Sequence, residues 1–458
     1  MAARTRDMTR GNPTKLILSF CLPIIAGNLF QQFYSLVDTL VIGQVEGVTA
    51  LAAVSAAGWL DWTVLGLAMG MAQGFAIQIA QSFGAGDYAG LRRAAGQSIL
   101  LSAAITVGLT LLSELLLWPM LTALRSPENT IALTCQYLRV IFGGVVFVMS
   151  FNLLSGFLRS LGDSKSPVWF LALASLINIV LDFAAIYGLK MGVAGAAIAT
   201  VVSQAVSGVL CVWYMKKHFD VLRMEKDDWK FRRAEALRLL GMGVPVGLQF
   251  SITAIGSVLL QSAVNSLGAI YVSGAAAASK LFQLFCCPYD ALATAATSFT
   301  GQNLGAGKYD RIRQGTRACN MIGLVYCCIH ILLALFTTRY AIWIFMSADE
   351  AQSVLAYTQQ MCNFVAFFSP LLLFVNVFRL SIQGMGYSRV ALCAGIMEMI
   401  ARTFVGIWAV PRFGYDAACL AGPFAWLLAD AFLIPAYFAC LRARERQAVE
   451  AKKLAARE

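Results

Sequence analysis

Gln81-Ser-Phe-Gly-Ala-Gly-Asp-Tyr88 is followed 221 residues later by Gln302-Asn-Leu-Gly-Ala-Gly-Lys-Tyr309, and the two stretches agree at five of eight positions. Nearly the same spacing pairs Pro23 with Pro245. A slightly larger spacing pairs the motifs that begin at Gly162 (Gly-Asp-Ser-Lys) and at Gly386 (Gly-Tyr-Ser-Arg). Three matches in the same order predict that the chain is an internal duplication.

The composition excludes a water-soluble protein. Apolar and aromatic residues make up 59% of the 458 residues, and charged residues only 13%, against roughly 25% in a soluble domain. Apolar stretches recur from Leu16 to Leu441, and each is long enough to cross a hydrocarbon core of roughly 30 Å. The alternating strands of a membrane barrel are absent from the pattern. We therefore expect an all-α integral membrane protein.

We expect twelve transmembrane helices in two similar six-helix lobes. The apolar stretches predict these helices at residues 14–40, 50–80, 94–117, 132–157, 167–188, 193–215, 241–264, 270–300, 316–338, 357–383, 390–410 and 418–441. Because the duplication covers six spans, both halves enter the membrane in the same direction, as parallel repeats that face each other across a central space. The expected domains are a first lobe at 1–215, a cytoplasmic linker at 216–240, a second lobe at 241–441 and a basic cytoplasmic tail at 442–458.

The net charge of +11 comes from Lys and Arg that gather in alternate loops. One side of the membrane holds both termini, the basic run 216–238 and most other cations. The opposite side keeps only Arg125, Lys190, Arg339 and Arg412. This asymmetry predicts a multi-pass protein of the cell inner (plasma) membrane with both termini in the cytoplasm. The basic tail then contacts lipid headgroups, and we expect no nucleic-acid partner.

Acidic residues inside the predicted spans are the first functional candidates, since a carboxylate at mid-membrane costs about 3 kcal/mol on insertion scales. Asp38 lies in the first span. Helical spacing places Tyr34 and Gln31 on the same face as Asp38. We interpret this polar stripe as facing protein rather than lipid, so that Gln31 and Tyr34 are candidates for lining a substrate cavity.

A second polar group falls in spans five and six. Asn178 precedes Asp182 by four residues, which puts the amide beside the carboxylate, and Thr200 and Gln204 repeat that spacing in the next span. Oxygen-rich groups of this kind either bind Na⁺ or let a buried carboxyl take up and release a proton. The alternative is that Asp38 and Asp182 only hold helices together by hydrogen bonds.

The second half has different chemistry. Glu398 precedes Arg402 by one turn, and we interpret the two as a structural ion pair. Asp290 either lines the cavity or pairs with Lys280 or a helix end. Asp430, near the end of the last span, is equally open to either a functional or a structural interpretation.

Nothing in the sequence predicts an enzyme. The chain has two histidines and twelve cysteines without CxxC spacing, so no nucleophile, acid–base group or metal cluster is indicated. We expect no cofactor, and no metal ion beyond a possible coupling Na⁺.

Across nearly its whole length the sequence resembles the multidrug and toxic compound extrusion (MATE) family. That resemblance implies two six-helix lobes, a V-shaped central cavity and rocker-type export of amphipathic, often cationic compounds in exchange for H⁺ or Na⁺. In members with a first-lobe cation site, positions matching Asp38, Asn178, Asp182 and Thr200 form that site. The resemblance rests on Val37-Asp38-Thr39, the loops at Gly84 and Gly305, Gly162-Asp163 with Pro167, Asn178–Asp182, Gly192–Ala197 and Thr200.

One departure separates the chain from members with a second-lobe cation site. Those members carry a glutamate in span seven, whereas residues 244–264 hold no acid, and residues 360–386 of span ten hold none either. The chain is in this respect similar to the DNA-damage-inducible branch, which implies coupling in the first lobe alone. The alternative within the same superfamily is a lipid-linked oligosaccharide flippase. We expect a monomer.

Overall fold

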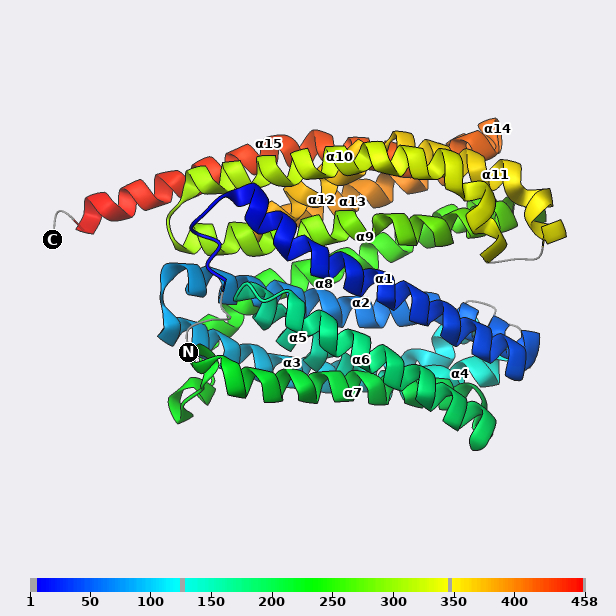
Figure 1. The fold of residues 1–458 in the computed structure, drawn as a ribbon, viewed down its shortest axis with the longest axis horizontal. Helices are drawn as coiled ribbons and strands as arrows, with labels where there is room; N and C mark the ends of the chain where they lie inside the picture. Colours follow the sequence, from blue (N-terminus) through cyan, green and yellow to red (C-terminus); the bar gives the residue numbers. More distant parts are fainter. Residues whose placement is uncertain (1–5, 124–127, 345–347, 456–458) are drawn as a thin grey trace. The chain divides into compact units, whose positions relative to one another are not determined.

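The computed structural model describes residues 6–123, 128–344 and 348–455, and these are almost entirely helical (Figure 1). The first half contains α1 (Pro13–Val45), α2 (Gly47–Ala85), α3 (Tyr88–Ala123), α4 (Glu128–Gly143), α5 (Val145–Ser160), α6 (Lys165–Asp182), the π-helix η1 (Phe183–Gly188) and α7 (Gly192–His218). Two 3₁₀ turns follow, η2 (Asp220–Leu222) and η3 (Lys226–Trp229). The second half contains α8 (Arg233–Asn265), α9 (Ala269–Gly305), α10 (Tyr309–Ala341), the 3₁₀ turn η4 (Ile342–Ile344), α11 (Ala348–Phe367), α12 (Ser369–Gly384), α13 (Ser388–Phe404), the π-helix η5 (Val405–Ala409), α14 (Val410–Phe413) and α15 (Tyr415–Ala455).

Within the described ranges, ten helices are long and apolar enough to cross a membrane, and two bent pairs raise the number to twelve if each pair is one span. The bends are 46° between α4 and α5 and 51° between α11 and α12. Each bent pair is the fourth span of its half. In the second pair Pro370 stands in the first turn of α12, where its missing N–H does not continue the preceding helix. The predicted fold class is thereby confirmed, including its six-plus-six repeat.

The repeated glycine motifs make matching turns in the two halves. Gly86 has φ 71° and Gly307 has φ 68°, and the second pair of motifs places Gly162 at 87° and Gly386 at 88°. Side chains other than glycine rarely adopt this left-handed conformation. The motifs therefore end the second and fourth spans of each half, as the turn interpretation predicts.

The chain divides into two compact units at three points, of which two fall inside helices and one falls between Asp7 and Met8, before α1. Unit 1 contains Ala26–Ser251, whereas unit 2 contains Met8–Ile25 and the chain from Ile252 onward. The first part of α1 thus belongs to unit 2 and the first part of α8 to unit 1. The sequence instead places the change between lobes in the linker at 216–240, of which residues 233–240 already belong to α8.

Within unit 1, α8 packs against α2 at backbone contact distance. An added Cβ on Gly70 would lie 2.7 Å from the Cα of Gly247, and one on Gly74 would lie 2.5 Å from the Cα of Gly243. Such small-residue rows let membrane helices approach closely. Gly66, one turn earlier, extends the row. The glycines at this spacing are what allow α8 to enter unit 1.

Within unit 2, α1 packs against α9 in the corresponding way. The thiol of Cys21 lies 3.4 Å from the carbonyl oxygen of Ala291, and both residues are fully buried. Cys21 stands 222 positions before Gly243, and Ala291 stands 221 positions after Gly70. The first helix of each half therefore contacts the second helix of the other half.

The segment that precedes α1 is held by the second copy of the duplicated loop. The backbone N–H of Met8 donates to Gln302 Oε1 at 2.8 Å, and Asn303 Nδ2 donates to the Met8 carbonyl at 3.2 Å. Lys308 Nζ donates to the Thr9 carbonyl at 2.9 Å. The polar positions of this loop thus anchor Met8 and Thr9 within unit 2.

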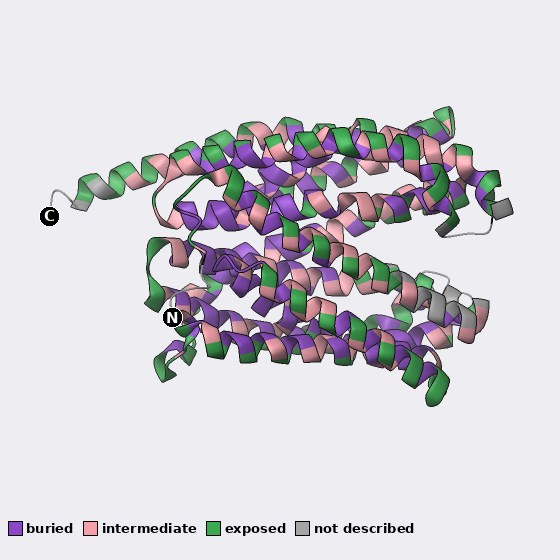
Figure 2. Ribbon diagram, in the orientation of Figure 1, coloured by how far each residue is buried: buried purple, intermediate pink, exposed green. Residues whose placement is uncertain are grey.

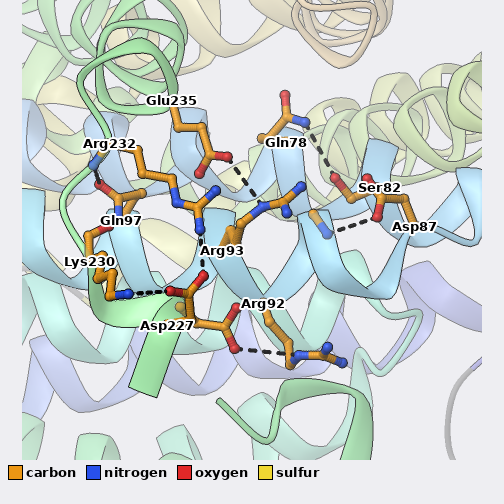
Figure 3. Close-up of polar contacts among 12 residues, drawn as sticks. Gln78, Ser82, Asp87, Arg92, Arg93, Gln97, Asp227, Lys230, Arg232 and Glu235 are labelled. Atoms are coloured by element: carbon orange, nitrogen blue, oxygen red, sulfur yellow. Dashed lines mark hydrogen bonds and ion pairs between the residues drawn. The ribbon is translucent and has the colours of Figure 1, made fainter. Parts of the chain in front are cut away.

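The linker that precedes α8 is held by α3 (Figure 3). Arg92 Nε lies 3.4 Å from Asp228 Oδ2. Gln97 donates from Nε2 to the Lys230 carbonyl at 2.7 Å and accepts from the Arg232 N–H at 3.0 Å. The linker is therefore docked on unit 1 by ion pairs and backbone hydrogen bonds.

Buried and exposed residues alternate along the helices of each unit (Figure 2), and many of the exposed residues are large and apolar. Leu115 is 76% exposed and Trp169 is 73% exposed, both on predicted spans. A surface with this many apolar side chains is unsuited to water. The helix surfaces therefore match a lipid environment.

We predict that Gly74→Val destabilises the protein because the new side chain has to separate α2 from α8. Overpacking of this kind costs about 1–3 kcal/mol, and the loss is measured as a lower melting temperature of the detergent-purified protein. Gly58→Val is the matched control, since a Cβ at Gly58 of α2 meets nothing within 4 Å. Equal losses in the two variants would contradict the close packing.

We predict that Gly96→Leu releases the linker, because a Cβ on Gly96 would lie 2.4 Å from the Asp228 carbonyl oxygen. If the contact of the linker with α3 weakens by about 1.4 kcal/mol, the fraction of molecules with a detached linker rises about tenfold. The initial rate of tryptic cleavage in the linker rises by the same factor. Gly108→Leu on the same helix has nothing within 4 Å and should leave the rate unchanged. An unaltered rate in Gly96→Leu would show that the linker does not need this contact.

Candidate functional site

Asn178 and Asp182 lie four residues apart on α6, and both are 1% exposed. α6 ends at Asp182, and the π-helix η1 follows directly. π-helical turns interrupt the regular backbone ladder and are frequent at functional sites. The second π-helix, η5, begins 222 positions after η1, since 405 minus 183 is 222. The sequence pattern gives no sign of either π-helix.

α6 and α7 pack together as antiparallel neighbours, and two contacts fix their register. These contacts are the Ser207 hydroxyl with the Phe170 carbonyl at 3.4 Å, and Gly195 with Ala185, where an added Cβ would lie 3.0 Å from the Ala185 Cβ. Midway between them, Asn178 lies level with Thr200. The fold thus brings the polar positions of the two helices to one level inside unit 1.

The side chain of Asn178 is buried without hydrogen bonds. Neither its amide nitrogen nor its oxygen has a partner among the residues that the structure describes, and the same holds for Gln204 Oε1. Leaving such a group unpaired costs about 1–3 kcal/mol in proteins. The Asp182 carboxylate, the Asn178 carbonyl and the Thr200 hydroxyl together offer the oxygen atoms that a hard cation prefers. A bound cation or water would satisfy the Asn178 oxygen.

The remaining predicted residues of the first lobe lie on α1. The side chain of Asp38 lies outside the described residues, so its place in the site stays a prediction. Gln31 and Tyr34 are half-buried. Their role in lining a cavity stays a prediction as well.

In unit 2, α9 has a polar face. Lys280, Gln283 and Asp290 are exposed, and helical spacing puts them on one side of α9 with Thr294. Asp290 and Lys280 are ten residues apart and form no ion pair within the described chain. Exposed polar groups on a spanning helix must meet water or polar ligand in a membrane.

A charged group that the sequence only partly indicates lies inside unit 2. Glu398 and Arg402 on α13 are 3.6 Å apart, the predicted ion pair. Arg379 of α12 also donates to Glu398 and is equally buried. An arginine in a span without acids needs a partner from another helix, and this was the signal that could have located Arg379.

The comparisons with known proteins agree with this architecture. The family model MatE matches twice, at residues 23–184 and 245–408. The chain is 32% identical over 419 residues to the "Probable multidrug resistance protein YpnP" of Bacillus subtilis (strain 168), covering 90% of this chain and 89% of that protein. It is 25% identical over 399 residues to the "Multidrug export protein MepA" of Staphylococcus aureus (strain bovine RF122 / ET3-1), covering 84% and 85%.

A solved structure described as the outward-facing conformation of a multidrug resistance MATE family transporter of the MOP superfamily has the same fold. The TM-score is 0.90 at 23% identity, and the match covers 97% of this chain and 99% of that one. The two copies of the family model coincide with the two halves of the duplication. The chain therefore belongs to the MATE family of membrane transporters and is not an enzyme.

Proposed function

We propose that this transporter exports amphipathic, often cationic compounds in exchange for H⁺ or Na⁺. The coupling cation binds in unit 1, at Asp38, Asn178, Asp182 and Thr200. The observation that carries the proposal is the buried Asn178 amide, which has no hydrogen-bond partner in the described chain and stands one turn from the Asp182 carboxyl. A buried amide oxygen beside a carboxyl group is suited to binding a cation reversibly.

The energetics fit an exchange driven by a membrane gradient. One elementary charge that moves through 100 mV gains about 2.3 kcal/mol. Binding of H⁺ or Na⁺ neutralises a carboxylate that is costly to keep charged inside the membrane. Release of the cation restores the charge, so the two states of the site favour different surroundings.

We propose that α1 transmits the state of the site. The division between the units falls between Ile25 and Ala26 of α1, so that Asp38 belongs to the part of α1 in unit 1. Pro23 lies two residues before the division and removes a backbone hydrogen bond, which lets a helix bend. A change at Asp38 therefore acts on a helix that both units share.

We propose that the substrate contacts the exposed polar face of α9 at Asp290. An acidic group on this face suits cationic compounds. Gln31, Tyr34 and Gln204 are proposed separately as substrate-contacting residues of unit 1. Two relatives are named as a multidrug export protein and a probable multidrug resistance protein. These names support the proposal that this transporter accepts several substrates rather than one. We further propose that the protein lies in the plasma membrane with both termini in the cytoplasm, because its cations gather in alternate loops. We also propose that it works as a monomer.

Flux into proteoliposomes tests this function. The full chain is reconstituted, and ethidium transport is driven in separate samples by a pH gradient and by a Na⁺ gradient. Transport under one of the two gradients, and its absence without a gradient, is the expected result. Flux that depends on neither gradient would contradict coupled export, and movement of lipid-linked oligosaccharide instead of ethidium would favour a flippase.

We predict that Asp182→Asn slows gradient-driven ethidium flux about tenfold or more. A tenfold loss corresponds to an increase of about 1.4 kcal/mol in the activation free energy of transport. The reason is that an amide cannot change charge when the cation binds. Asp416→Asn removes an exposed acid from the first turn of α15 and should leave the flux unchanged. A rate for Asp182→Asn equal to that of the wild type under both gradients would remove Asp182 from the coupling site.

A further inference from the structure

A buried cluster of four charged side chains lies inside unit 2, separate from the proposed cation site. The cluster consists of Arg379 on α12, Glu398 and Arg402 on α13, and Asp430 on α15. Arg379, Glu398 and Asp430 are all less than one-tenth exposed. Charges at such depth in a membrane protein are costly unless they are paired, and they mark functional positions by default.

Three members of the cluster satisfy one another. Arg379 donates from Nη2 to Glu398, and Arg402 Nη2 lies 3.6 Å from the other carboxylate oxygen of Glu398. Arg402 Nη1 donates to the Ser257 hydroxyl at 3.2 Å. The single negative charge of Glu398 therefore faces two guanidinium groups.

Asp430 is the member that lacks a hydrogen bond. It is 4% exposed, and neither of its carboxyl oxygens has a partner within the described chain. Arg379 lies near enough to attract it electrostatically, and Arg379 Nε also has no partner there. Within the described chain, a buried donor on Arg379 therefore lacks an acceptor, and a buried carboxyl on Asp430 that Arg379 attracts lacks a donor.

The charge count explains why this arrangement is poised. With Asp430 ionised the cluster has two positive and two negative charges, and with Asp430 protonated it has one net positive charge. Attraction to Arg379 favours the carboxylate, whereas burial without hydrogen bonds favours the neutral acid. Among the described residues, Arg379 donates to Glu398 and forms no ion pair with Asp430.

Among the described residues, Arg379 is the charged group that acts electrostatically on Asp430. Helix α9 also contacts α15 beside Asp430, through the apolar pair Phe282 and Trp426. Helices α12 and α13 contribute the three partners already named. The groups from α11 and α14 lie at the far end of α15, where Gln360 bonds Asp416, Tyr357 contacts Tyr415, and Arg412 stacks on Trp408. Two turns further along α15, the Tyr437 hydroxyl is occupied by a hydrogen bond to Thr316.

We propose that Asp430 is a second proton-binding site, located in unit 2, and that Arg379 changes partner when the proton leaves. The carboxylic acid releases H⁺ to water and becomes a carboxylate, while Arg379 keeps its charge and turns its unpaired Nε–H toward Asp430. Glu398 then relies on Arg402. Protonation of Asp430 thereby determines whether Arg379 of α12 bonds Glu398 on α13 or Asp430 on α15. This inference adds a second proton site to the transporter. It rests on the proposed function, because coupled export supplies the proton that Asp430 would bind.

Infrared difference spectroscopy on the full-length purified protein, recorded between about pH 6 and pH 10, tests the site directly, because exposed carboxyl groups stay ionised throughout that range. The wild type should show the C=O stretching band of a protonated carboxylic acid at low pH, and Asp430→Asn should lose one such band. Asp430→Glu should keep a shifted band, and Asp416→Asn should match the wild type. Spectra that are identical for the wild type and Asp430→Asn, including the case in which Asp430 never titrates, would overturn the proposal.

The partner change has its own measurement. Removing the neighbouring cation in Arg379→Gln should move the titration midpoint of the Asp430 band to higher pH, because the carboxylate loses its attraction. Arg402→Gln, which removes an equal charge from the far side of Glu398, should move it much less. Equal midpoints in the wild type and Arg379→Gln would overturn the role of Arg379. The infrared bands are measured without transport, so the two proposals can fail separately. If the wild type shows no coupled ethidium flux but Asp430→Asn still loses a band, the proposed function is rejected and the proton site is kept. If flux is coupled but Asp430→Asn loses no band, only the proton site is rejected.

Discussion

The backbone contact between α2 and α8 is the constraint on which the rest of unit 1 depends. Only glycine at Gly70 and Gly74 lets Gly247 and Gly243 approach so closely. The part of α8 that makes this contact belongs to unit 1, and the helix continues into unit 2 after Ser251. Unit 2 has its own version in α1, where small buried side chains take the place of glycine. The chain passes from one unit to the other within α1, within α8 and between Asp7 and Met8, and Pro23 and Pro245 lie near the two divisions inside helices.

The two halves share a frame but differ in the charges they bury. Just before the π-helix of its half, α6 carries Asn178 and Asp182, whereas α13 carries Glu398 and Arg402. Neutral oxygen groups beside an acid leave room for an external cation. A glutamate between two arginines is already neutralised. A π-helix therefore follows the proposed cation site in unit 1 and the ion pair of Glu398 with Arg402 in unit 2. Asp430 is the group in unit 2 that we propose to change charge.

Much of the fold was predictable because it depends on local features. Apolar length indicates the spans, and the turn glycines at Gly86 and Gly307 indicate where they end. The exchange of first helices was not predictable in this way, since it depends on which surfaces fit in three dimensions. The row of Gly66, Gly70 and Gly74 was nevertheless visible as small residues at helical spacing.

The candidate site was predictable to a similar extent. The spacing of Asn178 and Asp182 follows from the sequence, whereas their burial and the level of Thr200 depend on how α6 meets α7. Glu398 and Arg402 are near neighbours in the sequence and were paired correctly. The roles of Arg379 and Asp430 were not assigned, because their partners come from separate helices.

Cross-linking between α1 and α9 tests the exchange of first helices most directly. Native Cys21 is kept, the other cysteines are replaced, Ala291→Cys is introduced, and a protease site is placed in the linker. After mild oxidation and cleavage, the two halves should stay joined on a denaturing gel until a reductant is added, because Cys21 contacts position 291. Asp290→Cys, on another side of α9, should leave the halves separate. If the two halves of the Ala291→Cys protein also run separately on the gel, α1 does not contact α9 at these positions, and the exchange of first helices is contradicted.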